Sequence, residues 1–165
     1  MVLETSEGVS GHGPTFTNGH GNEVVVAAAR ALAPLVVGRE LCDITKDMRG
    51  FYHSLAQEAQ LRWLGPEKGT LHMPTGAVVN AVWDLWARRE GKPLWKLLVD
   101  LSPQQLVDCI DFMWITDALT PAEALALLQA RESGKAAREA EMREKGFPAY
   151  TTSAGWLGYS DEKVR

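Results

Sequence analysis

The segment from Pro74 to Leu101 constrains the fold of this chain more than any other. Its first half predicts a helix, because apolar residues recur at a spacing that forms one wide stripe: Val78, Ala81, Val82, Leu85 and Trp86. Pro74 suits the first turn of that helix, where a missing N–H costs nothing. Gly91 and Pro93 are typical of its end. The apolar residues of 94–98 then predict a second short helix that folds back on the first.

The chain before this segment predicts two short strands followed by helices. The expected elements are, in order, a strand at 2–5, a turn at 8–11, a strand at 12–17, a helix at 24–37, a polar connection at 39–48 and a helix at 49–61. Asn22 is expected to cap the first helix, and Pro34 to end or kink it.

The chain after this segment has a different character. The expected elements are an apolar strand within 106–115, helices at 121–130 and 135–145, a strand at 148–153 and the beginning of a helix at 160–163. Thr120 and Glu123 form the pattern of a capping box, which is a strong signal for a helix start.

The composition excludes several classes of protein. The net charge is −4 without a long block of like charge, so the sequence predicts neither a nucleic-acid surface nor a membrane surface. It has no run of about 20 apolar residues, and its start lacks the pattern of a secretory leader. Cys42 and Cys109 lie far apart without metal-ligand spacing, which favours a reduced, cytoplasmic protein and leaves a disulfide open.

The central segment also carries a family signature. It consists of Ala77, Ala81, Val82, Trp83, Asp84, Leu85, Gly91, Pro93, Leu97 and Leu98. These residues resemble the mandelate racemase and muconate-lactonising group of the enolase superfamily, although Val99 and Asp100 stand where many members have two glycines. Residues 60–69, 149–153 and 156–161 narrow the resemblance to the L-fuconate dehydratases and their close relatives.

The resemblance implies an α+β fold with two parts. Residues 1–101 would form the N-terminal capping domain, with an incomplete β-meander plus helices. Its first strand and the mobile loop after that strand are expected to be missing. Residues 102–165 would form the first strand or strands of a truncated (β/α) barrel, with a helical insertion at about 120–146. A complete barrel takes roughly 250 residues, so this part cannot close one.

The resemblance also implies a chemistry. Members abstract a proton next to a carboxylate, and a divalent metal ion, usually Mg²⁺, stabilises the resulting enediolate. Loss of a hydroxyl group would then convert the sugar acid L-fuconate to 2-keto-3-deoxy-L-fuconate. The K-x-K motif of the family does not occur in this sequence. No catalytic, cofactor-binding or metal-binding residue is therefore assigned, and this chain alone is expected to bind no Mg²⁺ and to be inactive.

Several polar residues favour a structural interpretation over a functional one. His12 and His20 would need further ligands to bind a metal ion, so surface turns are favoured. Gly11, Gly13, Gly19 and Gly21 do not form a phosphate-binding pattern. For Asp84 we favour a structural hydrogen bond or ion pair over catalysis. His53 and His72 are both expected at surface or satisfied positions, and Cys109 is expected to be a small buried apolar residue.

Tyr150, Thr151, Thr152 and Ser153 are the best candidates for lining a pocket, because they would lie on an early barrel strand, near the βα loops that build active sites. Packing within that strand is the favoured alternative. Four tryptophans, Trp63, Trp83, Trp86 and Trp95, could form one aromatic cluster. Apolar surface left exposed around them would favour self-association.

Two hypotheses for the whole chain stay open. It is either a part of an L-fuconate dehydratase-like enzyme or a non-catalytic interaction or dimerisation module derived from that family. The first predicts coding sequence for the missing barrel beyond Arg165, and the second predicts a cooperatively folded chain with a defined assembly state.

Overall fold

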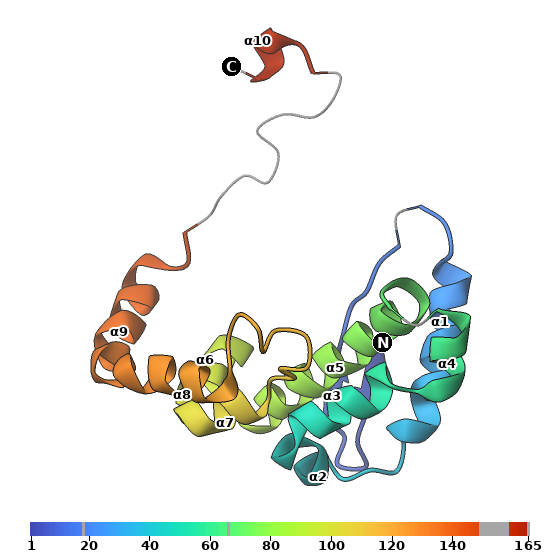
Figure 1. Cartoon of the computed structure of the whole chain (residues 1–165), viewed down its shortest axis with the longest axis horizontal. Helices are drawn as coiled ribbons and strands as arrows, with labels where there is room; N and C mark the ends of the chain where they lie inside the picture. The colour runs from blue at the N-terminus through green and yellow to red at the C-terminus, as the bar shows by residue number, and fades with distance from the viewer. Residues whose placement is uncertain (18, 66, 149–158, 165) are drawn as a thin grey trace. The chain divides into compact units, whose positions relative to one another are not determined.

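Helix α5, Gly69–Arg89, is the axis of the larger part of this computed structural model, which describes residues 1–17, 19–65, 67–148 and 159–164. The chain divides into two units, residues 1–126 and residues 127–165. Within the first unit, strand β2 and helices α1, α3 and α4 all pack against α5 (Figure 1).

The elements of the first unit follow one another with short connections. They are β1 (Val2–Glu4), β2 (Ser10–His12), α1 (Asn22–Leu32), a 3₁₀ turn (Ala33–Leu35), α2 (Leu41–Lys46), α3 (Met48–Ala56), α4 (Ala59–Leu64), α5, α6 (Leu94–Asp100), α7 (Pro103–Asp108) and α8 (Pro121–Ala130), which continues into the second unit.

The two strands form an antiparallel hairpin with Leu3 opposite Gly11. The backbone of β2 lies directly on α5. A Cβ atom at Gly11 would overlap the carbonyl oxygen of Ala81, and one at Gly13 would overlap that of Ala77. Both glycines are therefore required by this close approach. The expected second strand at 12–17 was placed too late in the chain, because the pairing is already made by residues 10–12.

The core of the first unit lies between α5 and the helices that precede it. Its most deeply buried side chains are Leu32, Phe51, Leu55, Leu71, Val78 and Val82. Full burial of a side chain of this size contributes about 1.5–3 kcal/mol. The apolar stripe predicted for the central helix is confirmed, since Val78, Ala81, Val82 and Leu85 are all buried.

The start of α5 differs from the prediction. Pro74 was expected in the first turn, but the helix begins at Gly69 and Pro74 lies inside it, fully buried. A proline at this position removes the N–H that would bond the carbonyl of Thr70. Leu71 accounts for the extension, because it is buried seven residues before Val78 and lengthens the apolar stripe by two turns. The end of α5 is as predicted, because Gly91 follows it with a left-handed backbone at φ +63°.

Three further expectations are corrected. The polar connection at 39–48 contains α2, and the single helix at 49–61 is broken between α3 and α4. The apolar strand at 106–115 does not form. In its place Ser102 and Gln105 form a capping box that starts α7, and residues 110–119 follow without regular structure. Such a box satisfies two backbone groups at once, whereas an isolated strand leaves its own backbone groups unpaired.

The start of α1 also differs in detail. Gly21, at φ +88°, occupies the cap position that was expected for Asn22. The side chain of Asn22 instead accepts a hydrogen bond of 2.6 Å from the hydroxyl of Thr17. The helix ends at Leu32 just before Pro34, as predicted.

The second unit contains the end of α8, a 3₁₀ turn (Glu132–Gly134), α9 (Lys135–Lys145) and α10 (Asp161–Val164). The predicted capping box at the start of α8 is confirmed, since Thr120 and Glu123 exchange hydrogen bonds. The expected strand at 148–153 falls almost entirely on residues outside the described ranges. None of the described helices is long and apolar enough to span a membrane.

Candidate functional site

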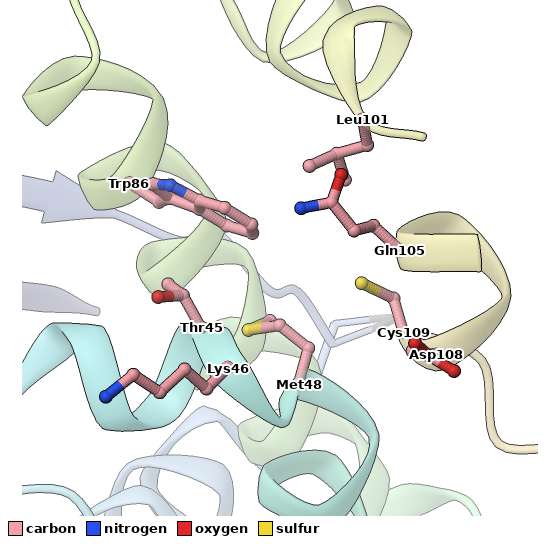
Figure 2. A pocket seen from close by; sticks show the side chains of 8 residues that line it. All are labelled: Thr45, Lys46, Met48, Trp86, Leu101, Gln105, Asp108 and Cys109. Carbon is pink, nitrogen blue, oxygen red and sulfur yellow. The ribbon is translucent and has the colours of Figure 1, made fainter. Parts of the chain in front are cut away.

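A pocket of about 360 Å³ lies in the first unit where α2, α3, α5 and α7 meet. Figure 2 shows the residues around it, with the ring of Trp86 on one side of the opening, Gln105 and Cys109 on the other, and Thr45, Lys46 and Met48 below them in this view. The complete lining is Thr45, Lys46, Met48, Trp86, Leu101, Gln105, Asp108 and Cys109. It combines apolar walls with a few polar groups, as ligand pockets generally do.

Most of the polar groups of this pocket already have local partners. The hydroxyl of Thr45 donates to the carbonyl oxygen of Cys42 at 3.3 Å, and the ammonium of Lys46 lies 3.4 Å from the carboxylate of Asp43. Asp108 accepts a hydrogen bond of 2.9 Å from Gln104. The side-chain oxygen of Gln105 accepts the backbone N–H of Ser102 in the capping box. These groups are used to hold the helix ends in place.

Cys109 places a thiol in the lining of this pocket. Burial raises its pKa, and the negative charge of Asp108 raises the pKa further. A thiol with a raised pKa stays protonated near neutral pH and is a poor nucleophile. The pocket is therefore suited to packing or weak binding of a small group, and it offers no paired acid and base for proton abstraction.

Asp84 joins the hairpin to the central helix. Its carboxylate accepts the backbone N–H of His12 at 2.8 Å and the Nε–H of Arg88 at 2.7 Å. Partial burial raises the pKa of Asp84, but the hydrogen bonds from Arg88 and His12 outweigh burial and hold the pKa below its usual value. This geometry supports the structural role that we favoured for Asp84.

Three of the four histidines each lie beside a single carboxylate in the described ranges. Besides His12 with Asp84, His53 lies 3.2 Å from Asp111, and His72 lies 3.6 Å from Glu67. The Asp111 partner was missed by sequence reasoning, because 58 positions separate it from His53 and no local pattern links them. His20 is exposed.

No three His, Cys, Asp or Glu side chains come close enough to hold a metal ion within the described ranges. The four pocket-lining candidates, Tyr150, Thr151, Thr152 and Ser153, lie outside those ranges.

The tryptophans form a smaller cluster than expected. Trp83 and Trp86 stack with ring centroids 5.3 Å apart. Trp63 lies on α4 with 89% of its surface exposed, and Trp95 is 43% exposed. The expectation that Trp63 joins the cluster is wrong, because the short α4 directs it to solvent.

Comparison with known proteins gives a consistent result over the whole length. Residues 1–99 match the model of the mandelate racemase / muconate lactonizing enzyme N-terminal domain. Mitochondrial enolase superfamily member 1 of Xenopus laevis is 58% identical over the entire chain, and L-galactonate dehydratase of Hypocrea jecorina is 50% identical over 99% of it. The crystal structure of the human mitochondrial enolase superfamily member 1 superimposes with a TM-score of 0.89 at 57% identity, over 99% of the chain.

The chain spans 38% of the length of the Xenopus laevis relative and 37% of the chain in the human crystal structure. The family match covers the hairpin and all helices from α1 to the greater part of α6. The expected capping domain, with a small antiparallel sheet and a majority of helices, is thereby confirmed. The chain belongs to the mandelate racemase/muconate lactonizing enzyme family of the enolase superfamily, and residues 1–99 are its N-terminal domain.

Proposed function

We propose that this chain is the capping part of a sugar-acid dehydratase. The reaction is removal of the proton next to the carboxylate, followed by loss of water to give a 2-keto-3-deoxy acid. The observation that supports it best is the 50% identity to L-galactonate dehydratase across 99% of the chain. The chain alone is proposed to be inactive, because it lacks the K-x-K motif of the family and its described residues hold no cluster of side chains that could bind a metal ion.

The proposed substrate is L-fuconate. This acid is 6-deoxy-L-galactonate, so it differs from L-galactonate only in carrying a methyl group where the other has a hydroxymethyl group. Support for L-fuconate comes from the resemblance of residues 60–69 and 156–161 to the L-fuconate dehydratases. A site that hydrogen-bonds a substrate hydroxyl strongly rejects an analogue without that hydroxyl. Comparing the turnover of the two acids therefore tests which of them is the substrate.

Mg²⁺ is the proposed cofactor of the whole enzyme. The described residues of this chain do not fit a site for it, because they contain no cluster of three carboxylate, imidazole or thiol ligands. A hard cation such as Mg²⁺ requires several oxygen ligands. We therefore derive no step through the metal ion, and assign to this chain only the covering of the site and its exclusion of water.

The division at Leu101 and the pocket role of Tyr150, Thr151, Thr152 and Ser153 are also proposals. The first is supported by the family match, which ends at residue 99. The second is supported by the sequence resemblance alone.

A cytoplasmic location is proposed from the two free cysteines. The names of the related mitochondrial proteins make the mitochondrion the alternative, which fractionation of the tagged protein in its host would decide.

A chimera tests the proposed function directly. The matched segment of the Hypocrea jecorina L-galactonate dehydratase is replaced by this chain, and formation of 2-keto-3-deoxy acid is measured with L-galactonate and with L-fuconate in the presence of Mg²⁺. We expect activity from the chimera and none from the chain alone. A folded but inactive chimera would contradict the capping role, and turnover by the isolated chain would contradict its inactivity.

The alternative function is a non-catalytic module that associates through exposed apolar surface. The observation in its favour is the amount of apolar side chain that α1 and α4 expose, Trp63 above all. An inactive chimera together with a defined oligomer of the isolated chain would favour this alternative.

A further inference from the structure

The connection between α6 and α7 consists of Leu101 and Ser102. It lies just after residue 99, where the match to the N-terminal domain of the family ends. A short connection at the edge of a domain can act as a hinge, because a few residues at the ends of two elements can absorb a change in backbone angles. The contacts on both sides of this connection decide whether it does so here.

Asp100, the last residue of α6, has two cationic partners. Its carboxylate lies 2.8 Å from the ammonium of Lys92 and 2.5 Å from the ammonium of Lys96. Lys96 is one turn earlier on α6, whereas Lys92 precedes α6 and donates its backbone N–H to the carbonyl oxygen of Ala87 on α5 at 3.0 Å. Asp100 therefore ties the end of α6 to a residue that is anchored on the end of α5.

Aspartate is an unfavourable residue at the end of a helix. The C-terminal end carries a partial negative charge, which repels a carboxylate. The two lysines compensate for this repulsion, since their hydrogen bonds lower the pKa of Asp100 to about 2 and keep the carboxylate ionised. A residue that contradicts the local preference is expected where a longer-range contact depends on it. Here Asp100, together with Val99, also departs from the two glycines that many members of the family have.

The other two residues of the junction are restrained as well. The side chain of Leu101 is buried, and its backbone N–H donates to the carbonyl oxygen of Leu97 at 3.2 Å. Ser102 begins α7 with the capping box that it shares with Gln105. Each of the three consecutive residues from Asp100 to Ser102 therefore has a restraint of its own.

We propose that the junction at residues 100–102 is a rigid coupling, in which Asp100, bound to Lys92 and Lys96, makes the N-terminal domain and α7 move as one body. Removing this contact would turn the junction into a hinge. The inference concerns motion within the first unit, so it does not depend on the proposed catalytic function.

Amide hydrogen exchange of the full chain, resolved by residue with NMR, tests the coupling. Asp100→Asn removes the charge and keeps the size of the side chain. We expect the amides of Leu101 and Ser102 to exchange at least about tenfold faster, because exchange reports local opening. Added NaCl should accelerate their exchange in the wild type and have little effect in the variant, because salt screens ion pairs. Glu141→Gln, which removes an exposed ion pair with Lys145 on α9, is the matched control and should leave these amides unchanged.

The sign of the change is decisive. If Asp100 were only a charge at a helix end, Asp100→Asn would relieve its repulsion by the helix dipole and slow the exchange. Lys92→Met is the second variant, because it removes the partner outside α6 and leaves the carboxylate in place. It should also accelerate exchange at Leu101 and Ser102. Slower or unchanged exchange in either variant would overturn the proposal.

Spin labels measure the motion itself. Asn80 on α5 and Gln104 on α7 are both exposed, and each is replaced by a labelled cysteine in a background whose native cysteines are serines. Double electron–electron resonance then gives the distribution of the distance between the two labels. We expect one narrow distribution with Asp100 present and a broader one after Asp100→Asn. A distribution that is already broad with Asp100 present, or equal widths for the two proteins, would show that Asp100 does not hold the junction.

Discussion

At the scale of single residues, two glycines hold the hairpin on the central helix. Gly11 and Gly13 lie against the backbone of α5 at Ala81 and Ala77, where no side chain fits. This contact gives a physical reason for the small residues four apart in the family signature. The sequence alone showed the alanines and the glycines, but it could not show that they meet, because more than 60 positions separate them.

We predict that Gly11→Ala lowers the free energy of unfolding by about 1–3 kcal/mol, because the new methyl group forces the hairpin away from α5. Gly76→Ala is the matched control. A Cβ atom there meets nothing within 4 Å, so removing a glycine from the interior of α5 should raise stability by about 0.5–1 kcal/mol. Urea denaturation of both variants checks the pair, and a neutral Gly11→Ala would show that the hairpin is not held as described.

Asp84 gives a prediction about pH. Its folded-state pKa is lowered from 3.8, with burial opposing the shift and the hydrogen bonds of Arg88 and His12 causing it. The ionised carboxylate therefore stabilises the fold above pH 4, and this contribution is lost as the pH falls through the folded-state pKa. We expect Asp84→Asn to cost about 1 kcal/mol at pH 7 and progressively less below pH 4.

Urea midpoints of the wild type and Asp84→Asn, measured over the same pH series, isolate this effect. The pKa values of Asp100, Asp111 and Glu123 are also lowered, but these residues are present in both proteins and cancel in the difference. A difference that stays constant down to pH 2 would show that the charge of Asp84 contributes nothing.

At the scale of elements, helices were easier to predict than strands. The capping box at Thr120 and the stripe of α5 are local signals, and both predictions are confirmed. The strand expected within 106–115 is wrong, because Val107, Ile110 and Phe112 have high β-propensity but their backbone has no neighbouring strand to pair with in the described ranges. The sequence does carry the signal of the helix that forms instead, because Gln105 follows Ser102 by three residues.

The capping box of α7 can be tested by substitution. Ser102→Ala removes the oxygen that accepts the backbone N–H of Gln105, and it should destabilise the chain by about 1 kcal/mol. Ser54→Ala is the matched control, because the Ser54 hydroxyl bonds a carbonyl inside α3 and caps no helix end. Thermal unfolding followed by circular dichroism measures both, and equal effects would argue against a capping role for Ser102.

At the scale of the whole molecule, the two units differ in what stabilises them. Every buried side chain of the described chain lies in residues 1–126, the last being Ala124. The described part of the second unit has none, and α9 is supported by exposed ion pairs such as Glu139 with Arg143 at 2.8 Å. Such pairs contribute about 0.3–0.5 kcal/mol each, so the free energy of folding comes almost entirely from the first unit.

The second unit should therefore be dispensable for folding. We predict that a chain shortened to residues 1–130, which keeps α8 whole, unfolds cooperatively in urea within about 0.5 kcal/mol of the full chain. The peptide 131–165 should show only weak helicity by circular dichroism, falling further with added salt, because a helix of 11 residues is marginal in isolation. A shortened chain that loses its cooperative transition would show that residues after 130 contribute to the core. A stably helical peptide would show that α9 is supported by more than its surface ion pairs.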